Sequence, residues 1–363
     1  MSLTPLSAPI ETESIKYIGS KQKLLPYILA LIQRTGAKRV LDGFTGSTRV
    51  AQALARQGYR VIANDIAVWS EVLATAYLCN PHPPSHYLPL IQHLNHTPPR
   101  DGWFTQTYGA LIHQGRKAPW QLHNLRKLDG IREEIEKISD ITEKSVALTS
   151  LMLALDKVDN TLGHFASYLR YWAPRSYDTL VLQIPKIPQN SEQHQVFRRD
   201  ILELIPGIEI DLAYFDPPYG SNNEKMPSSR VRYAAYYHLW TTVCLHDRPE
   251  VFGKALRRRD SRDTETDAPF ESFRTDTFGR PIALLALEKL LSSVRAEWIL
   301  LSYNSEGKLP LPQLLEVAHG IAKKVEVFSV NYKHHVMAKM HWNGAWLKSS
   351  QRTLQEYLLL IQK

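Results

Sequence analysis

The sequence predicts an α/β fold in which a parallel sheet is covered by helices on both faces and interrupted by an inserted segment that is mostly helical. Residues 39–42 and 59–63 form short strand-like runs, and residues 50–56 between them have a helical pattern. A strand–helix–strand unit of this length requires parallel pairing. After Asn80, closely spaced prolines and frequent aromatic residues replace the sheet pattern, which indicates the insert.

The remaining elements follow in chain order. Residues 24–32 predict a helix ahead of the first strand. Within the insert, residues 125–138 predict a charged amphipathic helix and residues 146–155 a more buried one. Sheet patterns are expected again at residues 208–215, 298–303, 325–330 and 356–361.

Domain boundaries follow from these patterns. One domain is expected to combine residues 1–80 with residues 196–363, and residues 81–195 form the insert. Residues 220–232 are expected to form a polar loop, and residues 254–279 a second polar loop that is mobile. A chain of 363 residues can bury a large core without disulfide bonds.

Charge and cysteine content restrict the class of protein. The net charge of +8 favours a polyanionic partner, although basic proteins without such a partner are common. The two cysteines, Cys79 and Cys244, provide neither a disulfide framework nor a zinc site, which is typical of a reducing cytoplasm. Residues 1–13 lack the apolar run of a signal peptide, and no run of about 18 apolar residues predicts a membrane span. We therefore expect a cytoplasmic protein without a bound metal.

The tetrapeptide Asp216-Pro217-Pro218-Tyr219 follows the apolar run 212–215, so it is expected at the carboxyl end of a buried strand, where open α/β sheets bind ligands. There the Asp216 carboxylate can accept hydrogen bonds from the exocyclic amino group of a base and stabilise the positive charge that develops on its nitrogen. The two prolines restrict the backbone so that a carbonyl can point into the site. Tyr219 offers a ring face for a base taken out of the stack. A plain turn after a strand is the alternative interpretation.

Two further segments have the character of ligand-binding turns. Residues 40–47 run from a strand into a turn with two glycines, which let the backbone approach a ligand but do not complete the dinucleotide fingerprint. Asp65 ends the next strand about 20 residues later, the usual place for an acid that binds ribose hydroxyls. In residues 17–21, Ser20 taken alone is interpreted as a helix cap, although the same helix N-terminus could hold a carboxylate.

In this order, the three segments resemble the Dam-type DNA adenine methyltransferases, strongly at the motifs and weakly between them, from residue 15 to residue 361. Members of that family carry a Gly-Ser-Lys or Gly-Gly-Lys segment before the cofactor turn and a target-recognition insert before Asp-Pro-Pro-Tyr. The resemblance implies a Rossmann-like methyltransferase sheet with a helical target-recognition insert. It also implies S-adenosylmethionine as cofactor and, as partner, double-stranded DNA with a flipped target base.

The resemblance assigns roles to single residues of the cofactor site. It places Tyr17, Gly19, Ser20 and Lys21 at the methionine end, Asp42, Phe44 and Gly46 in the main turn, Asp65 at the ribose and Asp200 at the adenine. For Asp200, the N-cap of a helix at residues 201–205 is the alternative role. The family turn usually has a second glycine at the position of Thr48, which puts the local backbone path in doubt.

Residues 156–175 resemble a subset of the family associated with restriction–modification, which would make a cognate restriction endonuclease a partner. Aromatic rings alternate with cations there, which suits base stacking and phosphate contact, and an aromatic-rich core is the alternative. Core packing and contact with the site are equally open for residues 236–238. The residues expected to contact DNA are His164, Tyr168, Arg170, Arg175, Arg230, Arg232 and Asn304.

Other activities were weighed against these residues. N4-cytosine methyltransferases more often carry Ser at the position of Asp216, so adenine is favoured and cytosine is the alternative. A methyltransferase acting on the cytosine ring carbon needs a thiolate, and neither Cys79 nor Cys244 follows a proline. A DNA-binding protein with an inactive methyltransferase fold has no chemical reason to keep residues 216–219. A nuclease, suggested by residues 257–260, would need a metal-binding carboxylate cluster that the sequence does not predict.

Overall fold

The computed structural model describes residues 5–6, 10–188, 193–220, 233–261, 268–332 and 354–363. These residues form a seven-stranded sheet in the order β3-β2-β1-β4-β7-β9-β8. Its strands are β1 (Arg39–Asp42), β2 (Arg60–Asn64), β3 (Gln195–Phe197), β4 (Leu212–Phe215), β7 (Trp298–Asn304), β8 (Lys324–Tyr332) and β9 (Leu354–Gln362). The first five in this order pair in parallel, whereas β9 is antiparallel to both neighbours. The expected α/β fold with a mostly parallel sheet is confirmed.

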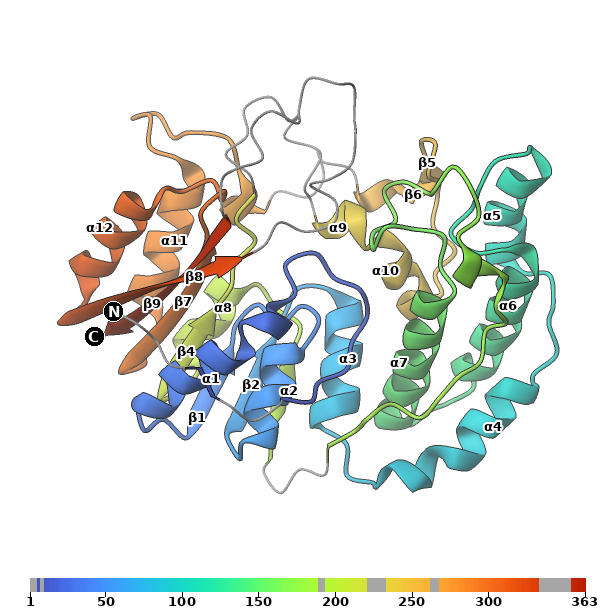
Figure 1. Ribbon diagram of the computed structural model, residues 1–363, viewed down its shortest axis with the longest axis horizontal. Coiled ribbons are helices and arrows are strands. Elements are labelled where there is room, and N and C mark those ends of the chain that lie inside the picture. Colours follow the sequence, from blue (N-terminus) through green and yellow to red (C-terminus); the bar gives the residue numbers. More distant parts are fainter. Residues whose placement is uncertain (1–4, 7–9, 189–192, 221–232, 262–267, 333–353) are drawn as a thin grey trace.

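Helices cover both faces of this sheet (Figure 1). Because successive strand residues point to opposite faces, Val40 and Leu41 of β1 belong to two different apolar layers. The Val40 layer contains α1 (Leu25–Arg34) and α2 (Arg49–Arg56), and the Leu41 layer contains α8 (Ile201–Leu204), α11 (Ile282–Ser293) and α12 (Leu311–Ile321). A strand covered on both sides is buried along its length, as β4 is.

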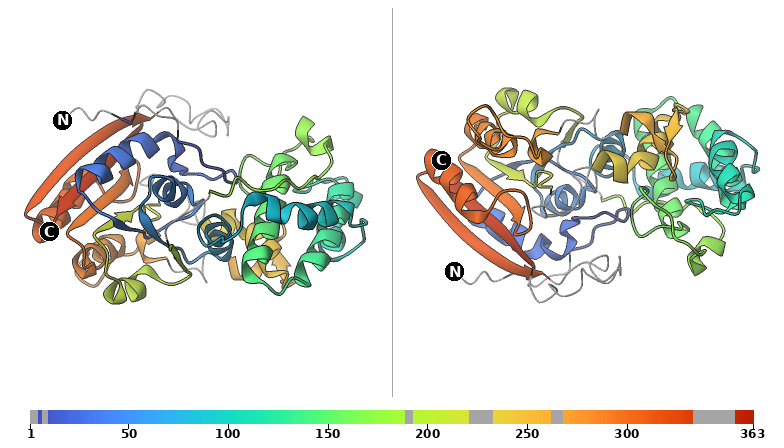
Figure 2. Two further views of the ribbon diagram at one scale, coloured as in Figure 1. Left: turned by 90° about the horizontal axis from the view of Figure 1, so that it is seen from below. Right: turned by 90° about the horizontal axis from the view of Figure 1, so that it is seen from above.

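The helices of residues 81–195 lie at the end of the molecule opposite β8 and β9 (Figures 1 and 2). They are α4 (Leu88–His96), α5 (Trp103–His113), α6 (Leu122–Glu136) and α7 (Ile141–Lys157), so the helices predicted at residues 125–138 and 146–155 are confirmed. Their core also includes Trp69 of α3 (Val68–Leu78) and Trp240 of α10 (His238–Leu245). Segments from outside the predicted insert therefore complete its hydrophobic core. In the described part of the chain, no helix is long and apolar enough to cross a membrane.

Residues 254–279, expected to form a mobile loop, instead contain short regular elements where the structure describes them. Among these are β6 (Arg257–Arg258) and η7 (Pro269–Glu271). The buried Arg258 guanidinium lies 2.7 Å from a carboxylate oxygen of Asp247 and 2.7 Å from one of Asp260. This pairing satisfies a charge that burial would otherwise penalise, and it ties the segment to Asp247, just after α10.

One strand was missed at the level of sequence, and one predicted loop is not described by the structure. The strand β3 was not predicted, because three residues at a sheet edge are too short to produce a recognisable periodicity. The loop predicted at residues 220–232 lies outside the described residues except for Gly220.

Candidate active site

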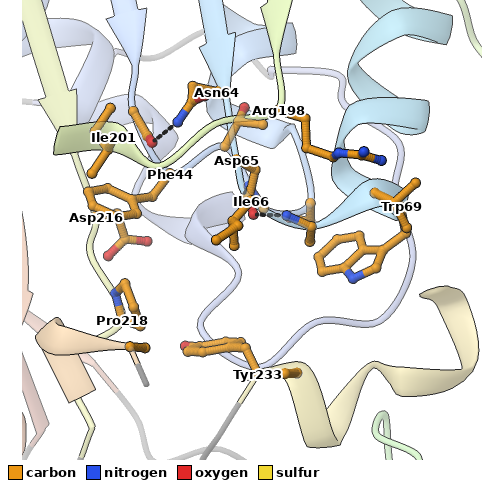
Figure 3. Close-up of a pocket in the computed structure, with 18 of the residues that line it drawn as sticks. Phe44, Asn64, Asp65, Ile66, Trp69, Arg198, Ile201, Asp216, Pro218 and Tyr233 are labelled. Carbon is orange, nitrogen blue, oxygen red and sulfur yellow. Dashed lines mark hydrogen bonds between the residues drawn. The ribbon is translucent and has the colours of Figure 1, made fainter. Parts of the chain in front are cut away.

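A cavity of about 770 Å³ lies where β1, β2 and β4 end (Figure 3). In the sheet, β1 lies between β2, the next strand in the chain, and β4, which comes much later. The strand order therefore reverses between β1 and β4, and open α/β sheets bind ligands at such a switch point. The cavity walls include Tyr17, Gly19, Lys21, Asp42, Phe44, Gly46, Asn64, Asp65, Ile66, Trp69, Asp200, Asp216, Pro218, Tyr233 and Phe270.

Asp42, at the end of β1, presents a buried carboxylate to this cavity. Its side chain is 1% exposed, and Oδ2 accepts a hydrogen bond from the Thr45 hydroxyl at 2.8 Å. Within the described residues, Oδ1 accepts no hydrogen bond. Burial raises the pKa of Asp42 to about 7. A buried carboxylate oxygen without a donor suits a ligand that carries a positive charge or an N–H group.

Asp65, after β2, shapes the turn that follows β1. Its Oδ2 accepts a hydrogen bond from the Gly46 amide at 2.8 Å, and Oδ1 accepts one from the Ala67 amide at 2.9 Å. Burial raises the pKa of Asp65, although these backbone donors act in the opposite direction. At Gly46, φ is +46°, and a Cβ would approach the Tyr17 hydroxyl to 3.3 Å. Glycine therefore allows Tyr17 to lie over the turn.

Thr48 resolves the doubt about the local backbone path. It has φ +63°, the left-handed conformation that glycine favours, and it is fully buried at the start of α2. Its hydroxyl accepts a hydrogen bond from Gln52 Nε2 at 2.8 Å. The Gln52 amide also exchanges hydrogen bonds with the backbone of Glu13. The left-handed turn is thus made by a threonine whose side chain anchors the N-terminal segment through Gln52.

An aromatic stack holds the segment that the resemblance assigns to the methionine end of the cofactor. The Tyr17 ring lies 4.8 Å from the Tyr237 ring and 5.4 Å from the Tyr233 ring, between centroids. The Tyr237 hydroxyl accepts a hydrogen bond from the Ile18 amide at 2.7 Å. Tyr237 is thus buried and packs against Tyr17, so core packing is observed for it, and it is not among the residues that line the cavity.

The next three residues bring a lysine into the same wall. Gly19 has φ +86°, and a Cβ there would come within 3.2 Å of the Tyr233 hydroxyl. Ser20 is the N-cap residue of η1 (Lys21–Lys23), as interpreted from the sequence, although its side chain makes no capping hydrogen bond. The Lys21 ammonium lies 2.8 Å from Asp216 Oδ1 and 3.1 Å from Glu356 Oε1. Although burial lowers the pKa of Lys21, these carboxylates outweigh it and hold the pKa well above its ordinary value.

The tetrapeptide after β4 is divided between the cavity and the core behind it. Asp216 and Pro218 line the cavity, whereas Pro217 is buried. Burial raises the pKa of Asp216 to about 7, against the lowering effect of Lys21. The Tyr219 ring packs 5.2 Å from the Tyr303 ring, and its hydroxyl accepts a hydrogen bond from Lys21 Nζ at 3.3 Å.

Asp200 combines the two roles considered from the sequence. Its Oδ1 accepts a hydrogen bond from the Leu202 amide at 2.8 Å, which confirms the N-cap of α8. The residue also lines the cavity, and contact with the cofactor's adenine stays a prediction.

The residues expected to contact DNA differ in their exposure and in their contacts within the protein. His164 is buried and stacks on Tyr236, the Tyr168 hydroxyl donates to the Ala255 carbonyl at 2.6 Å, and Arg175 pairs with Asp159 at 2.7 Å. Arg170 is exposed. Asn304 ends β7, and its amide nitrogen donates to Glu356 Oε2 at 3.4 Å. Arg230 and Arg232 lie outside the described residues, and DNA contact stays a prediction for this whole set.

Several cavity residues were missed at the level of sequence. They are Asn64, Ile66, Trp69, Tyr233 and Phe270. For Ile66 the sequence offers a signal, namely an apolar residue directly after Asp65. In the structure Ile66 is 76% exposed and lines the cavity. Asn64 bonds the Gly43 carbonyl and both backbone groups of Arg199, contacts that no spacing reveals.

Comparison with known proteins gives this site a family. Residues 17–272 match the model of the D12 class N6 adenine-specific DNA methyltransferases. The chain belongs to this family. Modification methylase StsI of Streptococcus sanguinis is 30% identical over 96% of this chain and 52% of its own length. Modification methylase LlaI of Lactococcus lactis subsp. lactis is 25% identical over 96% of this chain and 55% of its own length. The type II methyltransferase M.NlaIII of Neisseria lactamica is 28% identical over 85% of this chain and 89% of its own length.

Membership of the D12 class confirms the resemblance to DNA adenine methyltransferases, and it does not favour the N4-cytosine alternative. The chain spans about half the length of the StsI and LlaI methylases. A D12 methyltransferase implies S-adenosylmethionine as methyl donor. The cavity suits this molecule, since Asp42 offers an acceptor to its cationic end and Phe44 and Phe270, 5.3 Å apart, offer apolar surface to its adenine.

Proposed function

We propose that this chain transfers a methyl group from S-adenosylmethionine to the N6 amino group of adenine at a specific DNA sequence, as the modification enzyme of a restriction–modification system. One observation carries the proposal: the partly exposed carboxylate of Asp216 lines the same cavity as the acceptors Asp42 and Asp65. Relatives named as modification methylases and type II methyltransferases support it. The partner would be a cognate restriction endonuclease that cleaves the unmethylated sequence.

Residues around the cavity would bind and orient the cofactor, which supplies an electrophilic methyl group on a sulfonium centre. Asp42 Oδ1 would accept from its ammonium group, in the wall formed with Tyr17, Gly19 and Lys21. Asp65 would accept from the ribose hydroxyls while it holds the Gly46 amide. Asp200 would lie beside the adenine.

Asp216 would act on the target base. An exocyclic amino group is a weak nucleophile because its lone pair is delocalised into the ring. A carboxylate that accepts one of its hydrogens localises the lone pair and stabilises the positive charge formed at nitrogen during transfer. Asp216 must be ionised to do so, and the Lys21 ammonium at 2.8 Å favours that state. Tyr219 would stack on the ring, and no covalent enzyme intermediate is needed.

The DNA must deliver its base to this cavity. A stacked base cannot reach Asp216, so the target nucleotide has to leave the duplex. We assign residues 81–195 to target recognition. Exposed Arg170 would contact a phosphate, and the internal bonds of His164, Tyr168 and Arg175 would hold the same segment in shape.

Substitution of Asp216 tests the proposal. The Asp216→Ala variant should lose methylation by at least about a hundredfold and keep its cofactor affinity, because the carboxylate acts mainly in the transition state. DNA methylated by the wild type is digested and its nucleosides are identified by mass spectrometry, while calorimetry measures cofactor binding. Glu288→Ala, which removes a partly exposed carboxylate of α11 that pairs with Arg280, is the control and should be fully active.

N6-methyladenine is the expected product. N4-methylcytosine would instead establish the cytosine alternative, and methylation that persists in Asp216→Ala would contradict the assigned chemistry for either base.

A further inference from the structure

Glu356 is a second carboxylate beside Lys21, in addition to Asp216. Glu356 lies near the start of β9, next to the apolar run 358–361, and is 4% exposed. A buried glutamate in such a strand is costly unless its oxygens are bonded. Glu356 has three partners, since Oε1 lies 3.1 Å from Lys21 Nζ and accepts from the Ser302 hydroxyl at 2.7 Å, and Oε2 accepts from Asn304 Nδ2 at 3.4 Å.

The sheet register brings these groups together. Glu356 is paired with Asn304 across the antiparallel β7–β9 ladder, and Ser302 lies two residues earlier on β7. Parallel β4 adjoins the other edge of β7 and delivers Asp216 beyond its last residue. Lys21, from the N-terminal segment, fills the space between the two carboxylates, which stand on strands that β7 separates.

We propose that Glu356 is a positioning residue for the methyl transfer: it shares the Lys21 ammonium with Asp216, so that the Asp216 carboxylate stays free to accept a hydrogen bond from the target amino group. The inference rests on the proposed function. One ammonium between two carboxylates leaves a net negative charge, which suits a step in which positive charge develops on the base. Without Glu356, Asp216 would be the one carboxylate paired with Lys21 among the described residues, and the lysine would compete with the target amino group for it.

The pH dependence of the transfer step separates this role from a structural one. Because the active form of Asp216 is ionised, the rate is expected above its pKa and lost as the pH falls through about 7. Lys21 lowers this pKa and Glu356 raises it. Removing Lys21 should therefore move the acid limb of the pH–rate profile to higher pH, and removing Glu356 should move it to lower pH. The other titratable groups that interact with Asp216 are Tyr17, Asp42, Tyr214, Tyr219 and Tyr233. None of them is changed by the test.

The experiment measures single-turnover methylation against pH at saturating cofactor and DNA for the wild type, Glu356→Gln and Lys21→Met. Glu356→Gln should shift the acid limb to lower pH by about one pH unit and reduce the plateau rate by about tenfold to a hundredfold. Lys21→Met should shift the limb to higher pH by about one to three pH units. Glu356→Asp, which keeps the charge, should recover the wild-type limb with part of the rate.

Glu326→Gln is the matched control. Glu326 is a buried strand glutamate on β8 that pairs with Arg34 and Lys324 and has no contact with Lys21 or Asp216. Its substitution should leave the limb and the plateau unchanged. Thermal unfolding and calorimetric cofactor binding show whether each variant is folded, independently of methylation.

Two results would overturn the inference and can be told apart from failure of the proposed function. If the wild type methylates DNA and Glu356→Gln keeps the same limb and plateau, Glu356 has no part in the step. If Glu356→Gln loses rate only in proportion to its loss of folded protein, with an unmoved limb, its role is structural. A folded wild type that binds the cofactor and methylates no DNA would contradict the proposed function itself.

Discussion

Thr48 makes a turn that would suit glycine better. A β-branched residue with φ +63° carries a backbone strain of about 1–2 kcal/mol, which glycine would avoid. The threonine hydroxyl compensates because it is the acceptor for Gln52, whose amide in turn binds the backbone of Glu13. One side chain thus connects the cofactor turn to the segment that continues to Tyr17.

Substitutions at Thr48 should separate strain from hydrogen bonding. Thr48→Val keeps the strain and leaves a Gln52 N–H without its acceptor, so the free energy of unfolding should fall by about 1–3 kcal/mol. Thr48→Gly loses the same bond but relieves the strain, so the loss should be smaller. Denaturant unfolding measures both. A larger loss in Thr48→Gly than in Thr48→Val would show that the left-handed turn carries little strain.

At the scale of elements, α5 is capped by a neighbouring helix. Gly102, at its N-cap position, has no side chain to accept hydrogen bonds. Buried Asp129 of α6 does so instead, accepting from the amides of Gly102, Phe104 and Thr105 at 3.1, 3.0 and 2.8 Å. A carboxylate at a helix N-terminus is also favoured by the helix dipole. The start of α5 and the middle of α6 therefore form one unit.

Removing this carboxylate should loosen α5. Asp129→Ala leaves three amides without an acceptor and should lower the free energy of unfolding by about 2–3 kcal/mol, with faster hydrogen exchange at residues 102–105. Asp140→Ala is the comparison, since exposed Asp140 caps α7 through one bond to the Glu143 amide and should cost about 1 kcal/mol. Equal losses in the two variants would mean that Asp129 acts as an ordinary cap.

Elements were easier to predict than the contacts between them. Apolar runs gave the strands around Leu41, Ala213 and Leu300, and the position of Asp216 after such a run placed it at the site. Glu356 was predicted only as the first residue of a strand, because no periodicity links it to Lys21 far earlier in the chain. Strand order depends on packing between distant segments, so the place of β9 between β7 and β8 had no local signal.

The molecule as a whole carries a net charge of +8, which has a measurable consequence for the proposed DNA complex. DNA affinity should fall steeply with salt, because each Lys or Arg contact to a phosphate releases counterions. Arg170→Ala should reduce the slope of log affinity against log salt by about one, whereas Arg39→Ala should not, because Arg39 lies at the amino end of β1, away from the cavity. Binding titrations from low to physiological salt measure this. A wild-type affinity independent of salt would contradict electrostatic binding.

The position of β9 also has a consequence for the order in which the sheet can form. A chain synthesised from its N-terminus completes β7 and β8 before β9, yet β9 lies between them and pairs with both. Until residues 354–362 are made, the strands on either side expose unpaired edges, and Lys21 and Asp216 have no third charge beside them. The strand that closes the sheet is thus the one that brings Glu356 to the site. The ionic arrangement around Asp216 is thus completed only when β9 joins the sheet.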